Sequence, residues 1–322
     1  MKHSIGFGLL VLATTHCMAA DGPSAKPSRF VVAFAPGVPD DLLARALSQE
    51  LGKQTGKTYL VENRTGASGA IGFGFVAKSA PDGYTLGIVS TGWPATPLVN
   101  KAVTYDPVKD FTPIMQTTRA PLVLVVPGSM KVVNLKDFIA LTKASPGKFN
   151  YGTAGLGSAI HLASELFNKH SGIQLSHIPF KGGSSEIMSA VMSGEVQMLL
   201  TQAPPVLPQI RSGKLHALAV TAEPGKRLAN LPEVPTLSEA GLPGLMIYNW
   251  GGIVGPAGMP TDMTNRIHAE LHKALFAPAV KDPFIAQGTE FVGNRPEEFS
   301  AYVKSEVQRW EDLIKSTGIK FE

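Results

Sequence analysis

The chain has 322 residues, of which 44% are hydrophobic and 17% charged, and its formal net charge at pH 7 is +4. A chain of this length and apolar content can bury a large core, better divided between two lobes than built as one. The charge is small for the length and no stripe of Lys and Arg follows the sequence, which argues against nucleic acid as a partner.

The N-terminus has the pattern of an export signal. A short basic region precedes an apolar core over residues 5–14 and a small-residue cleavage site near Ala19 and Ala20. We therefore expect residues 1–20 to be a cleaved signal peptide and the mature protein to lie in the periplasm, since the apolar run is too short to span a bilayer. Cleavage would remove Cys17, the only cysteine, and with it any disulfide. A lipoprotein attached at Cys17 ranks second, because the residue before this cysteine is not small.

Strand and helix patterns alternate along the rest of the chain. Strands are predicted at 30–34, 59–62, 85–89, 122–126, 149–153, 175–178, 198–201 and 217–221, and helices at 42–54, 135–144, 160–170, 186–193, 261–276 and 296–316. This alternation predicts an α/β fold of largely parallel, doubly wound sheets flanked by helices. The chain is expected to cross between lobes near residues 122–126 and 250–254. These crossings divide it into lobe 1, residues 25–123 and 248–322, and lobe 2, residues 124–247.

One local device occurs twice in the sequence: a β-type run ends in small residues and leads directly into a helix. The first copy comprises Phe34, Pro36, Gly37, Val38, Asp40 and Asp41, and the second Ala154, Gly155, Gly157, Ser158 and His161. Free backbone N–H groups and the positive end of the dipole make a helix start suitable for an oxyanion. Ligands of doubly wound sheets bind beyond the carboxyl ends of the strands. We therefore expect the two copies to face each other and grip a carboxylate.

Four further side chains near these turns have two open interpretations. His161 either donates to the ligand or packs in the core. Thr91 and Trp93 follow the end of a strand, so the indole either lines the cleft or packs between the lobes. Lys181 either offers a cation to the ligand or belongs to an ordinary strand-to-helix turn capped by a serine.

The sequence contains no convincing catalytic arrangement. Residues 66–70 fail the nucleophile-elbow pattern at the last position. His268 and His272 are spaced like zinc ligands but lack the glutamate that should follow the first histidine. Residues 72–77 match the dinucleotide fingerprint formally, yet they follow a glycine-rich loop and not a strand. We expect no enzyme, no catalytic residue, no metal and no cofactor.

Nearly the whole mature chain resembles the Bug-type periplasmic receptors of tripartite tricarboxylate transporters. The matching segments, in chain order, are 34–45, 61–64, 80–86, 105–111, 151–167, 178–182, 213–215, 217–221, 232–236, 239–244 and 256–260. The resemblance implies a two-lobed, type II-like periplasmic binding protein whose lobes are joined by two crossing strands. It implies a monomer that closes over a small organic anion, held by the two turn–helix segments, and delivers it to integral-membrane permease subunits. A ligand-dependent partner of a membrane sensor is the alternative function, followed by a periplasmic hydrolase.

The chain departs from the family pattern at four positions. Val38 stands where a second glycine is usual and Asp40 where Ser or Thr is usual, while Gln197 and Thr201 replace residues that are commonly acidic. An aspartate beside a helix start opposes a bound anion, but it accepts hydrogen bonds from an amine or a hydroxyl. We hypothesise a ligand with one gripped carboxylate and a different opposite end, an aromatic group being one option, with Val38 and Trp93 as the apolar wall. Alternatively, Asp40 only caps its helix and points to solvent; Asp41 is the expected N-cap.

Overall fold

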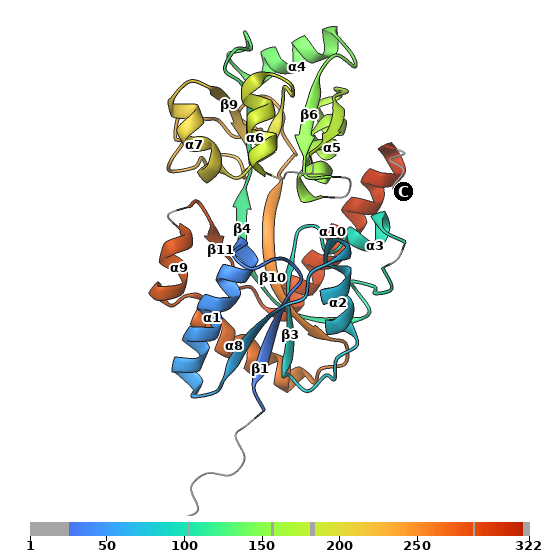
Figure 1. Cartoon of the computed structure of the whole chain (residues 1–322), viewed down its shortest axis with the longest axis vertical. Coiled ribbons are helices and arrows are strands. Elements are labelled where there is room, and N and C mark those ends of the chain that lie inside the picture. The colour runs from blue at the N-terminus through green and yellow to red at the C-terminus, as the bar shows by residue number, and fades with distance from the viewer. Residues whose placement is uncertain (1–25, 102, 156–157, 181–183, 286, 318–322) are drawn as a thin grey trace, which may run out of the picture.

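The computed structural model describes residues 26–317 apart from residues 102, 156–157, 181–183 and 286. Two bodies lie one above the other and are connected by two long strands, β4 (Phe111–Pro121) and β10 (Tyr248–Pro256) (Figure 1). We propose to divide the molecule at these strands into the lobes defined above. No helix of the described part is long and apolar enough to cross a membrane.

Lobe 1 is built on a six-stranded mixed sheet. Its strand order is β11-β4-β10-β3-β1-β2, where β1 is Ser28–Val32, β2 Tyr59–Asn63, β3 Thr85–Ser90 and β11 Glu290–Phe291. Its helices are α1 (Pro39–Thr55), α2 (Ala70–Ala77) after the 3-10 turn η1 (Ala67–Gly69), α3 (Thr96–Val99), α8 (Thr261–Leu275), α9 (Pro278–Ile285) and α10 (Pro296–Thr317). Because side chains alternate across a strand, Phe30 and Val32 pack under α1 and α8, and Val31 packs with α2 and α10 on the other face.

Lobe 2 is smaller and follows the same layered plan. Its strands are β5 (Val123–Pro127), β6 (Asn150–Thr153), β7 (Ser176–Pro179), β8 (Leu199–Thr201) and β9 (Leu215–Val220), and its helices are α4 (Leu135–Ala144), α5 (Ala159–Ser171), α6 (Ser184–Ser193) and α7 (Ala203–Arg211). β5 lies between β8 and β9, and a parallel bridge from Tyr151 to Met198 joins the β6–β7 pair to this sheet. Leu124 and Val126 face α4 and α5, whereas Val123 and Val125 face α6 and α7.

The predicted two-lobed α/β architecture is confirmed, but the expectation of largely parallel sheets is wrong. β1 pairs in parallel with β2 and β3, whereas β10 runs antiparallel to both β3 and β4, and β5 runs antiparallel to both of its neighbours. The reason is topological: β4 leads into lobe 2 and β10 returns from it. Two strands that carry the chain in opposite directions between the same lobes must run antiparallel when they pair.

The beginning of α1 also differs from the expectation. The helix starts at Pro39, whose missing N–H and fixed φ suit the first helical position. Val38 is the N-cap residue, in extended conformation and without a side-chain cap. Asp41 is therefore the third residue of the helix, so the prediction that it is the N-cap is wrong.

The two crossing segments meet at Thr221, just after β9. The backbone N–H of Leu122 donates to Thr221 Oγ1 over 2.8 Å, and the Thr221 N–H donates to the Leu122 carbonyl over 2.9 Å. The Thr221 hydroxyl in turn donates to the carbonyl of Ile247, at the start of the return crossing. One buried side chain thus joins both connections between the lobes.

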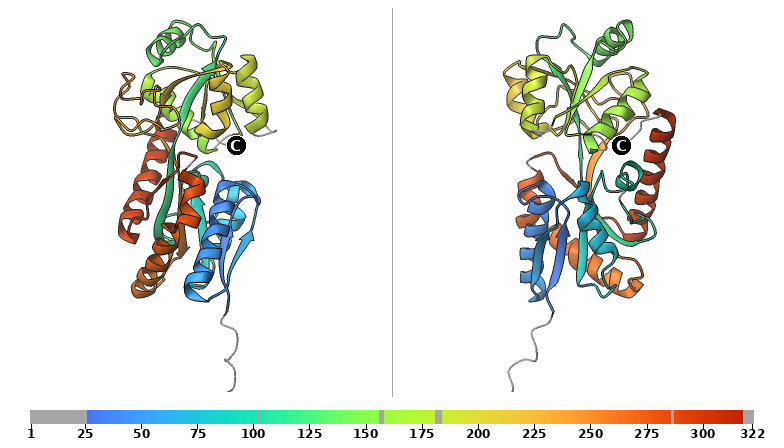
Figure 2. Two further views of the ribbon diagram at one scale, coloured as in Figure 1. Left: turned by 90° about the vertical axis from the view of Figure 1, so that its left-hand side faces the viewer. Right: turned by 45° about the vertical axis from the view of Figure 1, so that its right-hand side comes forward.

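A second contact between the lobes is made by α10. This helix starts in lobe 1 and rises along the molecule to reach lobe 2 (Figure 2). Near its end Trp310 and Leu313 are buried in a small cluster with Leu162 of α5. The C-terminal helix therefore packs against both lobes.

Candidate ligand-binding cleft

A cavity of about 360 Å³ lies between the lobes. Lobe 1 contributes Pro39 at the start of α1, lobe 2 contributes Ala154 and Thr201, and the return crossing contributes Asn249. Much of the remaining lining is apolar and comes from lobe 2: Ile160, Ile187, Met188, Leu199, Leu200 and Pro205. The beginning of α1 and the turn before α5, which the sequence predicted to face each other, thus line one cavity. We call residues 34–41 the first jaw and residues 153–161 the second jaw.

Asp41 holds the first jaw together. Its carboxylate accepts hydrogen bonds from the Gly37 N–H over 2.9 Å, from Nε and Nη2 of Arg45 over 2.9 and 3.0 Å, and from Nδ2 of Asn63 over 2.9 Å. The carboxylate is buried, and the bonds from Arg45 are the main reason why the pKa of Asp41 falls to about 2. Asp41 was expected to bind the ligand, but its acceptor positions are taken by the protein. It is a positioning residue, and it also occupies the Gly37 N–H.

Asp40 has a different environment. Its side chain is half-buried and lines a second cavity, of about 40 Å³, beside Arg119 and Asn249. Burial raises the pKa of Asp40 to about 6, and a hydrogen bond with the Ser90 side chain acts against this rise. Of the two alternatives for this residue, the geometry therefore favours the interior of the cleft over solvent.

The second jaw is held by hydrogen bonds between residues that are close together in the chain. The Gly155 N–H donates to Thr153 Oγ1 over 3.0 Å, and Gly155 has a φ of 129°, a conformation that favours glycine. Ser158 is the N-cap residue of α5 and accepts from the His161 N–H over 3.2 Å. Ala154 is exposed and lines the cleft. Two expected ligand residues of this region, Gly157 and Lys181, lie outside the described residues.

A partly buried polar cluster lies behind the second jaw. The His161 imidazole is 2% exposed, and its ring centroid lies 4.3 Å from that of His177. Thr153 Oγ1 lies 2.5 Å from His177 Nε2, and the Tyr151 hydroxyl donates to the Glu165 carboxylate. Burial, with a smaller contribution from His177, lowers the pKa of His161 to about 4, so this imidazole is neutral near pH 7. These contacts favour the packing interpretation of His161.

Thr91 and Trp93 both follow β3 but lie in different places. Thr91 is buried at the back of the cleft, where its hydroxyl donates to Asn249 Oδ1 over 3.1 Å and accepts from the Trp250 N–H over 2.7 Å. Trp93 is 1% exposed and packs edge-on against Phe111, with ring centroids 5.1 Å apart. The indole therefore belongs to the lobe 1 core, and the expectation that it forms a wall of the cleft is wrong.

The remaining expected residues divide between surface and support. Pro36 and Gly37 are exposed at the tip of the first jaw and Val38 is half-buried beside them. Phe34 meets the ring of Phe73 edge-on at 6.2 Å, which anchors the jaw on the core. Gln197 is structural, because its Oε1 accepts from the Asn150 N–H over 2.8 Å and its Nε2 donates to the Gly194 carbonyl.

Sequence reasoning missed two polar residues that line the cleft, Asn249 and Gln202. Both line the main cavity and the smaller cavity at Asp40. Asn249 stands next to Trp250, which was assigned to a crossing, so its position was a usable signal. Gln202 follows directly after β8, where ligand residues of α/β sheets are common.

Arg119 was also missed. It lies near the end of β4, and its Nη1 is 2.9 Å from Glu223 of lobe 2 while its Nε is 2.8 Å from Glu290 of β11. Its guanidinium also lies 4.7 Å from the centroid of the Tyr248 ring. Arg119 therefore links the two lobes at the edge of the smaller cavity.

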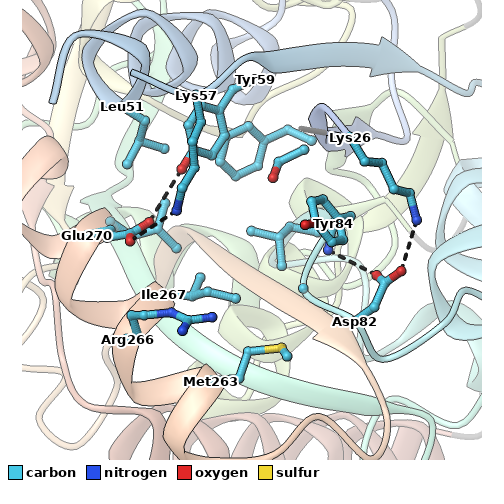
Figure 3. Close-up of a pocket in the computed structure, with 15 residues that line it drawn as sticks. Lys26, Leu51, Lys57, Tyr59, Asp82, Tyr84, Met263, Arg266, Ile267 and Glu270 are labelled. Carbon is cyan, nitrogen blue, oxygen red and sulfur yellow. Dashed lines mark hydrogen bonds and ion pairs between the residues drawn. The ribbon is translucent and has the colours of Figure 1, made fainter. Parts of the chain in front are cut away.

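Another pocket, of about 130 Å³, lies in lobe 1 away from both jaws. Figure 3 shows the residues that line it. It is lined by residues at the starts of β1 and β2, whereas the first jaw follows the end of β1. Two of its cations are paired, Lys26 with Asp82 at 2.9 Å and Lys57 with Glu270 at 3.5 Å. Neither jaw contributes to it, so it is not the candidate site. Among the described residues no cluster of His, Cys, Asp and Glu could hold a metal ion.

Comparison with known proteins gives consistent matches over most of the chain. A family model described as tripartite tricarboxylate transporter family receptor matches residues 43–319. The chain is 33% identical over 320 residues to protein BugT of Bordetella pertussis, which is 99% of this chain and 97% of BugT. Rpa4515 of R. palustris, solved with adipate, has a TM-score of 0.76 at 32% identity and covers 91% of this chain and 98% of its own. MatC of Rhodopseudomonas palustris, solved with bound malate, has a TM-score of 0.73 at 30% identity. The match covers 89% of this chain and 98% of MatC.

Proposed function

The chain belongs to the tripartite tricarboxylate transporter receptor family, whose members are solute-binding receptors and not enzymes, and from this premise we propose that it captures a small organic carboxylate between its two jaws. We further propose that the mature protein works in the periplasm and delivers this ligand to the permease subunits of such a transporter. The pattern of residues 1–20 supports export, and the family description supports the transport role.

The observation that carries the proposal is the shared cavity of the two jaws. Pro39 of the first jaw and Ala154 of the second line the same space, and each precedes helical N–H groups without an intrahelical acceptor. Such groups, together with the helix dipole, favour an anion. The adipate and malate found with Rpa4515 and MatC support a carboxylate as that anion.

The available interactions are strong enough for a receptor. A hydrogen bond to a charged group contributes about 1.5–3 kcal/mol, and a helix terminus adds about 0.3–1 kcal/mol. Binding in the micromolar range requires about −8 kcal/mol. Three or four donors and the apolar lining of lobe 2 therefore suffice, and no covalent step is needed.

The proposal is tested by thermal shift of the purified mature protein with mono-, di- and tricarboxylates. We expect at least one carboxylate to raise the melting temperature, because a ligand at about a hundred times its Kd stabilises the folded state by roughly 2.7 kcal/mol. Ala154→Phe should abolish this shift by filling the cleft. Ala257→Phe places the same ring at an exposed position outside the cavity and should leave the shift unchanged. A preparation that no carboxylate stabilises would contradict the proposal.

A further inference from the structure

We infer that Asp40 makes one end of the cleft a subsite for a hydrogen-bond donor, so that the preferred ligand is a monocarboxylate with a distal ammonium, amide or hydroxyl group and not a dicarboxylate. This inference rests on the proposed function, because it assumes that a carboxylate of the ligand lies between the jaws. It assigns to Asp40 the discrimination between ligands of equal length.

The subsite is continuous with the main cavity. Pro39, Gln202 and Asn249 line both the larger cavity and the smaller one at Asp40. A ligand that lies with its carboxylate between Pro39 and Ala154 can therefore extend into the smaller cavity without leaving the cleft. The distal end of such a ligand meets the Asp40 carboxylate.

The charges around the subsite oppose a second carboxylate. Arg119 is a cation at this cavity, but its charge is already shared by Glu223 at 2.9 Å and Glu290 at 2.8 Å. Lys226 lies 2.6 Å from Glu223 and is directed to it. With Asp40 ionised, the subsite and the groups ion-paired with Arg119 next to it together hold three carboxylates and two cations, which leaves an excess of negative charge. A ligand carboxylate entering here would lose water beside like charges, which is unfavourable.

Asp40 itself has room for a donor. Its described polar partner is the Ser90 side chain, and the described residues show no ion pair to Asp40. A carboxylate can accept about four hydrogen bonds, so one from Ser90 leaves acceptor positions for a ligand N–H or O–H. A positively charged or neutral donor therefore satisfies Asp40, whereas a carboxylate does not.

The subsite also makes ligand preference depend on pH. The pKa of Asp40 is raised to about 6, so the side chain is ionised near pH 7.5 and largely protonated near pH 5. Among the described residues, Arg119 of β4 is the other charged group that lines the subsite. Glu290 of β11 and Glu223 of lobe 2 pair with Arg119, and Lys226 pairs with Glu223, whereas the lining residues Gln202 and Asn249 are neutral. Because protonation of Asp40 removes one negative charge, the difference in affinity between dicarboxylates and ligands with a distal donor should become smaller at low pH.

The test compares three ligands of equal length by calorimetry: adipate, adipic acid monoamide and 6-aminohexanoate. A shorter series of succinate, succinamate and 4-aminobutyrate repeats the comparison in case the cleft selects for length. We expect the wild-type protein near pH 7.5 to bind the amide or the ammonium compound at least about tenfold more tightly than the dicarboxylate of the same series. Asp40→Asn has the same size without the charge and should remove most of this preference.

Two controls keep the test decisive. Asp262→Asn makes the same change at an exposed position of α8 outside the cleft and should leave every affinity unchanged. Asp40→Ser is the second variant in case Asp40→Asn folds poorly. The titration of the ligands is common to wild type and variants, so only a pH effect that disappears with Asp40 supports the inference.

A dicarboxylate that binds most tightly to the wild type, or a preference that both Asp40 variants retain, would overturn the inference. Under either result, thermal stabilisation by a carboxylate leaves the proposed function intact. Failure of every carboxylate to stabilise the protein overturns both.

Discussion

The two jaws have the same local design but are held in place by different physics. The first jaw rests on a charged network in which Asp41 binds Arg45, Asn63 and the Gly37 N–H. The second rests on local hydrogen bonds of Thr153 and Ser158 and on ring packing, with the buried His161 packed against the rings of Tyr151 and His177. Two helix starts that line one cavity are therefore supported by different chemistry. The difference predicts that the jaws respond differently to mutation, acid and salt.

The largest effect is expected at Asp41. Asp41→Ala removes four hydrogen bonds, takes away the acceptor of the Gly37 N–H and leaves the Phe34 carbonyl as the remaining acceptor for Asn63 Nδ2, so we expect a loss of about 2–4 kcal/mol in the free energy of unfolding. Urea unfolding followed by circular dichroism measures it, and carboxylate-induced thermal shift should be lost as well. Asp262→Ala is the control. A change no larger than that of the control would mean that Asp41 does not support the jaw.

A smaller effect is expected behind the second jaw. Tyr151→Phe removes the hydroxyl that donates to Glu165, a carboxyl group whose pKa is raised by burial. We expect the free energy of unfolding to fall by about 1–2 kcal/mol. Tyr84→Phe is a matched control, because the described residues offer the Tyr84 hydroxyl no hydrogen bond. If Tyr151→Phe unfolds at a lower urea concentration than Asp41→Ala, the ranking of the two supports is reversed.

Acid should separate the jaws by pH range. His161 has a folded pKa of about 4, below its ordinary 6.5, so the unfolded chain binds more protons between these values and stability falls as pH drops through that range. Asp41 has a folded pKa of about 2, below its ordinary 3.8, and its contribution is lost only at lower pH. One histidine can change the free energy of unfolding by at most about 1.4 kcal/mol per pH unit.

His161→Gln isolates this contribution. The difference in unfolding free energy between wild type and variant should shrink as pH falls from near neutral to about 4, because the wild type loses stability that glutamine cannot lose. Asp40, with its raised pKa, gains stability in part of the same range but contributes equally to both proteins. A difference that stays constant with pH would show that His161 is solvated and not buried.

The smallest effect concerns the ion pair that links the lobes outside the jaws. Glu223→Gln removes the interlobe partner of Arg119. Because this ion pair is partly exposed, we expect the free energy of unfolding to fall by less than about 1 kcal/mol. The measurable signature is salt dependence: added salt should weaken ligand binding less in the variant than in the wild type. Equal salt dependence in both proteins would exclude this pair from lobe closure.

The sequence was sufficient to predict the features that depend on local patterns of residues. The jaws, most strands and the two crossings follow from residues that are near each other in the chain. The role of Asp41 was predictable only in part, because its partners Gly37 and Arg45 are near it in the chain whereas Asn63 lies on β2. Trp93 was misplaced for a similar reason, since a strand end does not reveal that Phe111 covers the indole. Arg119 is part of a site only because Glu223 and Glu290 arrive from distant segments.

The packing of α10 has a mechanical consequence. Trp310 and Leu313 of this helix are buried with Leu162 of lobe 2, and both crossings are joined at Thr221. A rotation that separated the lobes at α10 would bring a tryptophan into water, whereas a rotation that separates them at α9 breaks no such apolar cluster among the described residues (Figure 2). The axis of opening should therefore run close to the C-terminal helix. In that arrangement the solute enters from the side of α9, and α10 determines the direction in which the lobes rotate.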